Sequence, residues 1–278
     1  MTVTAAPTLR PPHQAWTPIR VVALGDSLTS GDGVGVVTPP GQTWAARLAD
    51  RLRPSSFACL ATPGATARVV RQRQLPAALE ARPHLATVCV GLNDLVKTGC
   101  RPPELAADVS AVVADLRGCG ATVVLARLHD PAQVFRLPRG LAQQLSRRVT
   151  TVNAAVDAAA AGDTGVVVVD LAPLAQDARC WAVDRVHPSS VGQGLLAAQA
   201  ADRLGLPAQV PGEDGPHGGH VPSTAAHLWW LTSSGMPWLV RRVGEIGPPV
   251  LGMVAAAARQ HAPRWPLRRV PAGPPASA

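Results

Sequence analysis

Five short apolar runs, separated by segments with helical spacing, constrain the fold of this chain more than any other feature. Most of the runs are rich in Val, Ala and Leu without polar alternation, which is typical of strands covered on both faces. Between the first two, Trp44, Leu48 and Leu52 recur at four-residue steps, as in an amphipathic helix. This alternation predicts a parallel sheet with helices on both faces. The expected strands are Ile19–Leu24, Ser56–Ala61, Leu85–Val90, Ala121–Ala126 and Gly165–Asp170.

Capping residues sharpen several of the expected helix ends. Gly118 and Gly120 are typical of a helix C-terminus, and Ser189 or Ser190 of an N-cap. The expected helices are Gln42–Arg53, Ala65–Leu75, Ala77–Ala81, Glu104–Arg117, Arg139–Ala161 and a last one from Ser189 or Ser190 through Leu204.

Composition changes after this strand and helix pattern ends. Pro, Gly and His become frequent, which predicts a linker, and a Trp-rich helical segment over Thr224–Val243 follows. We expect Gly-Pro-Pro at 247–249 to interrupt the helix before a short Ala-rich one. The expected organisation is a flexible lead-in (1–18), an α/β domain (19–206), a linker (207–222), a Trp-rich helical extension (223–262) and a disordered tail (263–278).

The net charge of +8 alone would suggest a nucleic acid or an anionic membrane surface as partner. However, Lys97 is the only lysine, and the arginines are scattered with no run longer than two. Together with abundant alanine, this composition is most simply explained by a high-GC coding bias. We therefore expect no nucleic-acid partner.

Cysteine usage and the absence of targeting segments favour a cytoplasmic protein. The cysteines are odd in number and form no Cys-x-x-Cys pair, which is typical of reduced thiols. The first twenty residues lack the apolar stretch of a signal peptide, and no apolar run approaches 18 residues. The cysteines are Cys59, Cys89, Cys100, Cys119 and Cys180.

Candidate site residues follow four of the five predicted strands. Ser27 follows the first in Gly-Asp-Ser-Leu, Gly64 the second, Asn93 the third, and Asp184 and His187 share the loop after the fifth. Ligands of open parallel sheets bind beyond the carboxyl ends of the strands. Residues far apart in the sequence are therefore expected to meet at one edge of the sheet.

The spacing Asp184-x-x-His187 lets the carboxylate accept one imidazole N–H and leave the other nitrogen as a base. A serine hydroxyl needs such a base to act as a nucleophile. The backbone N–H groups of Ser27 and Gly64, with the Asn93 amide, would supply donors for an oxyanion. Each residue also has a plainer interpretation: Ser27 as a turn or cap serine, Gly64 as a turn glycine, Asn93 as an Asx-turn residue.

The sequence lacks the motifs of several other kinds of functional site. Thr29 stands where Gly-x-Ser-x-Gly needs glycine, and the glycine spacing after the first strand fits neither phosphate-binding pattern. The histidines lack paired ligand spacing, and His217 and His220 in the linker are expected to be solvated rather than bound to zinc. We expect neither a metal nor a cofactor.

With these residues, the sequence resembles the SGNH hydrolases of the GDSL esterase/lipase family. Its four named elements occur in order as Ser27, Gly64, Asn93 and His187, and the resemblance covers residues 19–206. It implies a three-layer α/β/α fold similar to flavodoxin with a central five-stranded parallel sheet. It also implies that Ser27 is nucleophile and oxyanion donor, Gly64 and Asn93 the other donors, His187 the base and Asp184 its partner.

Actinobacterial members are similar in two further places, the Trp-Ala-x-Asp-Arg approach to the histidine and Pro-Trp-x-x-Arg-Arg at Pro237–Arg242. Cys59 departs from the family pattern, because many relatives have asparagine there. We expect this change to alter a supporting hydrogen bond and not the triad.

The sequence therefore predicts a serine hydrolase that cleaves carboxylic esters of small molecules or lipids. The alternative is an acyltransferase that passes the acyl group to a sugar or lipid hydroxyl, and a non-enzymatic binding module is a third hypothesis. The sequence leaves the substrate and the oligomeric state open. The C-terminal extension has three interpretations: packing on the core, self-association, or peripheral membrane contact through Trp229, Trp230, Trp238, Leu239, Arg241 and Arg242.

Overall fold

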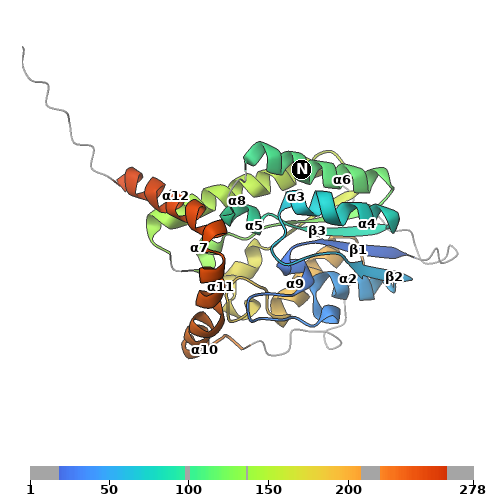
Figure 1. The fold of residues 1–278 in the computed structure, drawn as a ribbon. Coiled ribbons are helices and arrows are strands. Elements are labelled where there is room, and N and C mark those ends of the chain that lie inside the picture. Colours follow the sequence, from blue (N-terminus) through green and yellow to red (C-terminus); the bar gives the residue numbers. More distant parts are fainter. Residues whose placement is uncertain (1–18, 98–100, 136, 208–219, 262–278) are drawn as a thin grey trace, which may run out of the picture.

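A parallel sheet of five strands lies at the centre of the molecule, in the order β2-β1-β3-β4-β5 (Figure 1). The structure, a computed structural model, describes residues 19–97, 101–135, 137–207 and 220–261. All four strand pairings are parallel, which confirms the predicted sheet. The strands are β1 (Arg20–Gly25), β2 (Ser56–Cys59), β3 (Leu85–Cys89), β4 (Thr122–Arg127) and β5 (Val166–Asp170).

Helices cover both faces of the sheet and give the three-layer α/β/α fold. Helices α2 (Trp44–Leu52) and α9 (Ser190–Arg203) pack against each other on one face. On the other face lie α4 (Leu75–Glu80), α6 (Pro102–Gly118) and α8 (Arg139–Ala160). All five residues of β3 are buried, as a strand covered on both faces requires.

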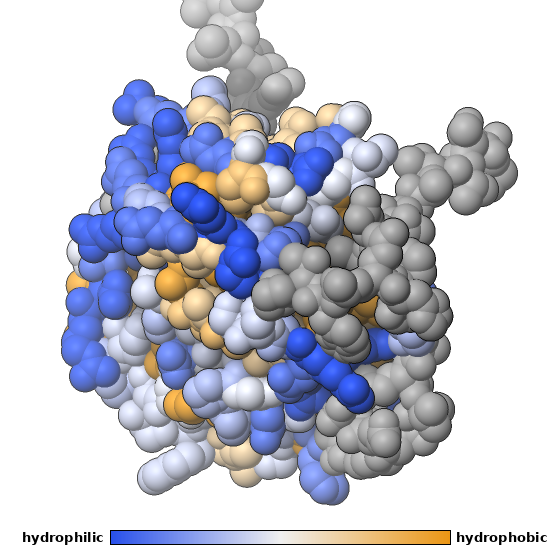
Figure 2. Space-filling view, turned by 90° about the vertical axis from the view of Figure 1, so that its right-hand side faces the viewer, coloured by the Kyte–Doolittle hydropathy of each residue, from blue (hydrophilic) through white to orange (hydrophobic). Residues whose placement is uncertain are grey.

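The connections of β1 create a switch point at the carboxyl end of the sheet. The chain passes from β1 to β2 on one side and then to β3 on the other side of β1. Such a reversal opens a crevice between the two loops that leave the neighbouring strands. The opposite, amino-terminal edge faces the viewer in Figure 2, where hydrophilic side chains cover much of the described surface.

Short elements connect the main layers. They are α1 (Ser27–Ser30), η1 (Pro40–Gln42), α3 (Ala67–Val69), η2 (Val70–Gln74), α5 (Leu92–Val96), α7 (Pro131–Val134), η3 (Ala172–Gln176) and η4 (Ala178–Cys180).

The two helices expected over Ala65–Leu75 and Ala77–Ala81 are one continuous run, so that prediction was wrong. The π-helical η2 joins α3 to α4, and the Leu75 N–H bonds to the Val70 carbonyl oxygen. This wider turn carries the chain past Pro76, whose nitrogen has no hydrogen to donate. The run therefore continues where the proline was expected to end it.

The C-terminal extension continues from α10 (Thr224–Trp230) through the π-helical η5 (Leu231–Gly235) and α11 (Met236–Arg241) to α12 (Val243–His261). The predicted break at 247–249 is wrong, because α12 runs through both prolines. The buried Ile246 and Met253, seven residues apart, form one stripe of α12, and that helix packs against α8. This packing compensates for the backbone bonds that the prolines remove. The predicted lead-in, most of the linker and the whole predicted tail lie outside the described residues.

Candidate active site

Ser27 lies just beyond the carboxyl end of β1, at the first position of α1. The Asp26 side chain caps this helix by accepting the Leu28 N–H at 3.0 Å. Gly25 makes the turn possible, because its φ is +143° and a Cβ there would lie 2.2 Å from the Cys89 carbonyl oxygen. The half-buried Ser27 is therefore held at the switch point by a backbone path that requires glycine at position 25.

Gly64 lies in the turn after β2 and has a φ of +79°, which L side chains rarely adopt. Its carbonyl oxygen accepts a 2.6 Å hydrogen bond from Lys97 Nζ. The backbone N–H groups of Ser27 and Gly64 have no acceptor among the residues that the structure describes. Backbone donors left without a partner at this edge are the groups that an oxyanion needs.

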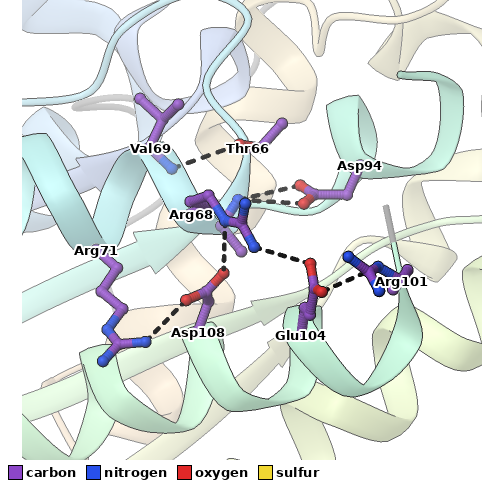
Figure 3. A network of polar contacts seen from close by, with 9 residues as sticks. Thr66, Arg68, Val69, Arg71, Asp94, Arg101, Glu104 and Asp108 are labelled. Atoms are coloured by element: carbon purple, nitrogen blue, oxygen red, sulfur yellow. Dashed lines mark hydrogen bonds and ion pairs between the residues drawn. The ribbon is translucent and has the colours of Figure 1, made fainter. Parts of the chain in front are cut away.

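A network of polar contacts ties the run after Gly64 to α6 (Figure 3). Arg68 binds Glu104 at 2.8 Å, and Arg71 binds Asp108 at 3.0 Å. Both arginine side chains are about half-exposed, so each ion pair alone adds little stability. Their combined effect is to limit how far the run beyond the Gly64 turn can move relative to α6.

Asp94 fixes the same run from the side of β3. Its two carboxylate oxygens lie 3.1 and 3.3 Å from the Ala67 nitrogen, whose N–H they accept at the start of α3 (Figure 3). Burial raises the pKa of Asp94 to about 6, against the opposing effect of this hydrogen bond. The loop after β3 thereby positions the loop after β2.

Asn93 follows β3 and lies in α5. Its Nδ2 donates to Asp26 Oδ2 at 3.0 Å and to the Ala65 carbonyl oxygen at 3.1 Å. The amide thus joins the turns that carry Ser27 and Gly64. Because both of its protons point to protein acceptors, donation to an oxyanion requires one of them to be redirected.

Asp26 is fully buried between these turns. Burial raises its pKa to about 6, while the Leu28 N–H, the nearby His187 and the Asn93 amide oppose the rise. The Asn93 amide ties this carboxyl group to the loop after β3, and Gly33, further along the loop after β1, lies against the His187 ring. Loops after β1, β3 and β5 therefore meet at one place.

The spacing Asp184-x-x-His187 folds as the sequence predicts. Asp184 Oδ2 lies 2.5 Å from His187 Nδ1, and both side chains are buried. Asp184 Oδ1 accepts the backbone N–H of His187 at 3.0 Å, which closes the turn. A carboxylate can only accept, so Nδ1 carries the proton. The opposite nitrogen, Nε2, is buried and has no partner among the described residues.

Gly33, in the loop after α1, lies against the His187 ring. A Cβ at this position would be 2.6 Å from Nδ1 and 2.8 Å from Cε1, too close for any side chain. Here glycine is required by space and not by its φ. The loop that begins at Ser27 thus passes over the imidazole six residues later.

Two residues that the sequence did not reveal stabilise the carboxyl edge of the sheet, which we call the rim. Gln74, buried in η2, accepts the Gly25 N–H at 2.8 Å and donates to the Gly25 carbonyl oxygen at 2.9 Å. Nothing in the polar sequence around Gln74 distinguishes it from an exposed residue. Lys97 did carry a signal, because it is the only lysine in a chain that otherwise uses arginine.

His129 and Trp181 pack together beneath the loop that bears His187. Their ring centroids are 4.2 Å apart, and both side chains are almost fully buried. Burial lowers the pKa of His129 to about 4, so the ring is neutral at physiological pH. Trp181 also forms a β-bridge with Pro188, next to His187, and the pair therefore supports the base-bearing turn.

Within the described part of the chain, no group of three or more His, Cys, Asp or Glu side chains is arranged to hold a metal ion. The four cysteines in these ranges are free thiols. None of the described helices combines the length and apolar character needed to cross a bilayer.

The three-layer α/β/α fold and its family match show the class of the protein, the carboxylic ester hydrolases. Residues 23–195 match the model of the GDSL-like lipase/acylhydrolase family, and the chain belongs to this family. No curated protein matches the chain in sequence.

Solved structures support the same fold. TesA is 22% identical, with a TM-score of 0.52 over 66% of this chain and 97% of its own. The acetylxylan esterase Axe2 of Geobacillus stearothermophilus is 16% identical, with a TM-score of 0.55 over 69% and 96%. EstA, an esterase from Pseudoalteromonas sp., is 18% identical, with a TM-score of 0.51 over 67% and 96%. At these identities the likeness establishes the fold and not the substrate.

Proposed function

We propose that the chain is a serine esterase in which Ser27, His187 and Asp184 form a catalytic triad. The observation that carries this proposal is the 2.5 Å contact between Asp184 Oδ2 and His187 Nδ1 in a buried pair. The carboxylate keeps the proton on Nδ1 and leaves Nε2 as a base with no protein partner among the described residues. Gly33, in the loop that begins at Ser27, lies against the same imidazole ring.

In the first half of the reaction, Ser27 Oγ attacks the ester carbonyl carbon while His187 Nε2 takes the hydroxyl proton. The tetrahedral intermediate collapses, the bond to the alcohol oxygen breaks, and Nε2 returns the proton to that oxygen. The products of this half are the free alcohol and an ester between the acyl group and Ser27. Asp184 stabilises the imidazolium that forms in between.

In the second half, His187 Nε2 takes a proton from a water molecule, and the hydroxide attacks the acyl carbon. The bond to Ser27 Oγ breaks as the proton moves to that oxygen, which releases the acid. In both halves the oxyanion would accept the N–H groups of Ser27 and Gly64. Asn93 would join them when one amide proton leaves Asp26 or Ala65.

A fluorophosphonate probe tests this assignment directly. We expect covalent labelling of Ser27 and hydrolysis of p-nitrophenyl acetate, both lost in Ser27→Ala. Ser55→Ala is the matched control, because this exposed serine precedes β2 at the amino-terminal edge of the sheet. Unchanged hydrolysis in Ser27→Ala would refute the proposal.

The same acyl-enzyme would serve an acyltransferase. Transfer to a sugar or lipid hydroxyl differs from hydrolysis only in which nucleophile reaches the acyl carbon. Product analysis with acceptor alcohols separates the two, because hydrolysis yields free acid whereas transfer yields a new ester.

We further propose that the outer face of the extension contacts an anionic lipid surface. Outside the extension, only Val37, Leu195 and Val221 are exposed large apolar residues in the described ranges. Trp229 is 74% exposed, and the exposed Arg241 and half-buried Arg242 add positive charge next to the apolar residues. The protein should cosediment with phosphatidylglycerol vesicles at low salt and less at high salt. If the protein does not cosediment with the vesicles, this contact is refuted. The cytoplasmic location remains a prediction from the sequence.

A further inference from the structure

One face of α10 and η5 makes polar contacts with the two loops that surround His187. Trp230 Nε1 donates to the Val34 carbonyl oxygen at 2.5 Å, across 196 residues of sequence. His227 Nδ1 donates to the Val183 carbonyl oxygen at 2.6 Å. The two rings stack with centroids 5.7 Å apart and an interplanar angle of 21°. A single helical turn therefore holds both loops.

The first contact leads to the imidazole through the glycine loop. Next to Val34, a Cβ on Gly35 would lie 2.6 Å from Ser234 Oγ, so the loop lies tightly against η5. Gly33, on the other side of Val34, lies directly against the His187 ring. The loop is thus confined between η5 and the imidazole, and it cannot shift without changing one of these contacts.

The second contact leads to the same ring through its carboxylate partner. Val183 immediately precedes Asp184, whose Oδ2 lies 2.5 Å from His187 Nδ1. The backbone carbonyl that His227 holds is therefore one residue from the group that orients the base. The two contacts reach the imidazole from different loops.

We propose that α10 and η5 form a brace that keeps His187 in its working orientation, with His227 and Trp230 as positioning residues. This inference rests on the proposed role of His187 as the base. The extension is then part of the catalytic apparatus, although none of its residues needs to touch the reacting atoms. An imidazole that can tilt loses the alignment between Nε2 and the serine hydroxyl, which slows proton transfer while leaving ester binding intact.

The neighbouring Trp229 provides a matched control. It is the same residue type on the same helix but points outward and is 74% exposed, whereas Trp230 is half-buried. Replacement by phenylalanine at either position keeps one aromatic ring and removes the N–H donor together with part of the indole. The two changes differ because only Trp230 bonds to Val34, stacks on His227 and lies against Gly235.

The test compares Trp230→Phe, His227→Ala and their combination with Trp229→Phe in the full-length protein. For the double variant we expect kcat for p-nitrophenyl acetate to fall about 10- to 100-fold, with KM nearly unchanged. The rate of labelling by a fluorophosphonate probe should fall in parallel, and Trp229→Phe should match the wild type. His227→Gln, which keeps an N–H donor near the Val183 carbonyl, should recover part of the lost kcat.

Thermal unfolding measured on each variant separates positioning from general loss of structure. A fall in kcat with an unchanged melting temperature supports the brace, and equal losses in Trp229→Phe and Trp230→Phe contradict it. If the double variant keeps wild-type kcat while Ser27→Ala is inactive, the brace is refuted and the triad stands. If Ser27→Ala retains activity, the triad itself fails first.

Discussion

The rim of the sheet and the C-terminal extension differ in how firmly the rest of the molecule fixes them. At the rim, Ser27 and Asn93 follow neighbouring strands, so the register of β1 and β3 sets their separation. The extension depends on side chains instead. Of its large apolar residues in the described range, only Ile246 and Met253 are buried. The backbone topology of the sheet therefore places the residues of the rim, whereas only a few side-chain contacts hold the extension against the rest of the molecule.

The buried pair in the loop after β5 is where the rim should be most sensitive to change. Asp184→Asn keeps the shape of the side chain, but its amide can donate to Nδ1 and favour the wrong imidazole tautomer. We expect kcat/KM to fall about 10³- to 10⁴-fold with the fold intact. Steady-state kinetics with circular dichroism as a check on folding would measure this. A loss below tenfold would show that the pair is structural only.

A second prediction contrasts stability in the two regions. Leu125 is fully buried in β4, so Leu125→Ala should lower the unfolding free energy by about 3–5 kcal/mol and the melting temperature by about 10 °C. Met253→Ala should loosen α12 and leave the main calorimetric transition almost in place, because α12 packs on the outside of α8 and not against the sheet.

Limited proteolysis provides the local measurement for the same pair of variants. Cleavage within 220–261 should accelerate in Met253→Ala and not in Leu125→Ala under native conditions. If Met253→Ala instead lowers the main transition as much as Leu125→Ala, the extension is an integral part of the core and the contrast fails.

Within the rim, the amide of Asn93 should matter both for chemistry and for placement. Asn93→Ala removes its bonds to Asp26 and Ala65 and a candidate oxyanion donor. We expect a loss of about 3 kcal/mol of transition-state stabilisation, seen mainly in kcat. Asn153→Ala is the control, since this residue likewise binds main-chain groups of Leu128 but should cost stability and little kcat.

Much of the fold and of the rim was predictable because the signals are local. Continuous apolar runs determine strands, and four of the five runs are followed, at once or after a loop, by a residue that the parallel topology brings to the same edge. The pairing of Asp184 with His187 was equally accessible, because three residues of one turn suffice to form it.

What the sequence could not predict depends on long-range burial. Gln74 contacts Gly25 across 49 residues and lies in a π-helical turn with no local sign. The helix through Pro248 and Pro249 persists because α12 packs on α8, and a proline rule applied to the segment alone predicts the opposite. The contacts of His227 and Trp230 could not be predicted for the same reason, since each joins α10 to a loop that is remote in sequence.

The smallest predicted effect is a pH dependence that belongs to the rim alone. Burial raises the pKa of Asp94 to about 6 from 3.8, so the folded state binds a proton that the unfolded state has already lost. The contribution of Asp94 to stability therefore decreases as pH rises from about 4 to 7, by about 2 kcal/mol. Asp94→Asn keeps an oxygen for the Ala67 N–H and removes the titration, so its unfolding free energy should fall less over this range. Denaturant unfolding at pH 4 and pH 7 measures the difference, and the exposed Asp50→Asn should behave like the wild type. An identical pH slope in Asp94→Asn and wild type would show that this carboxyl group is not destabilised by its burial.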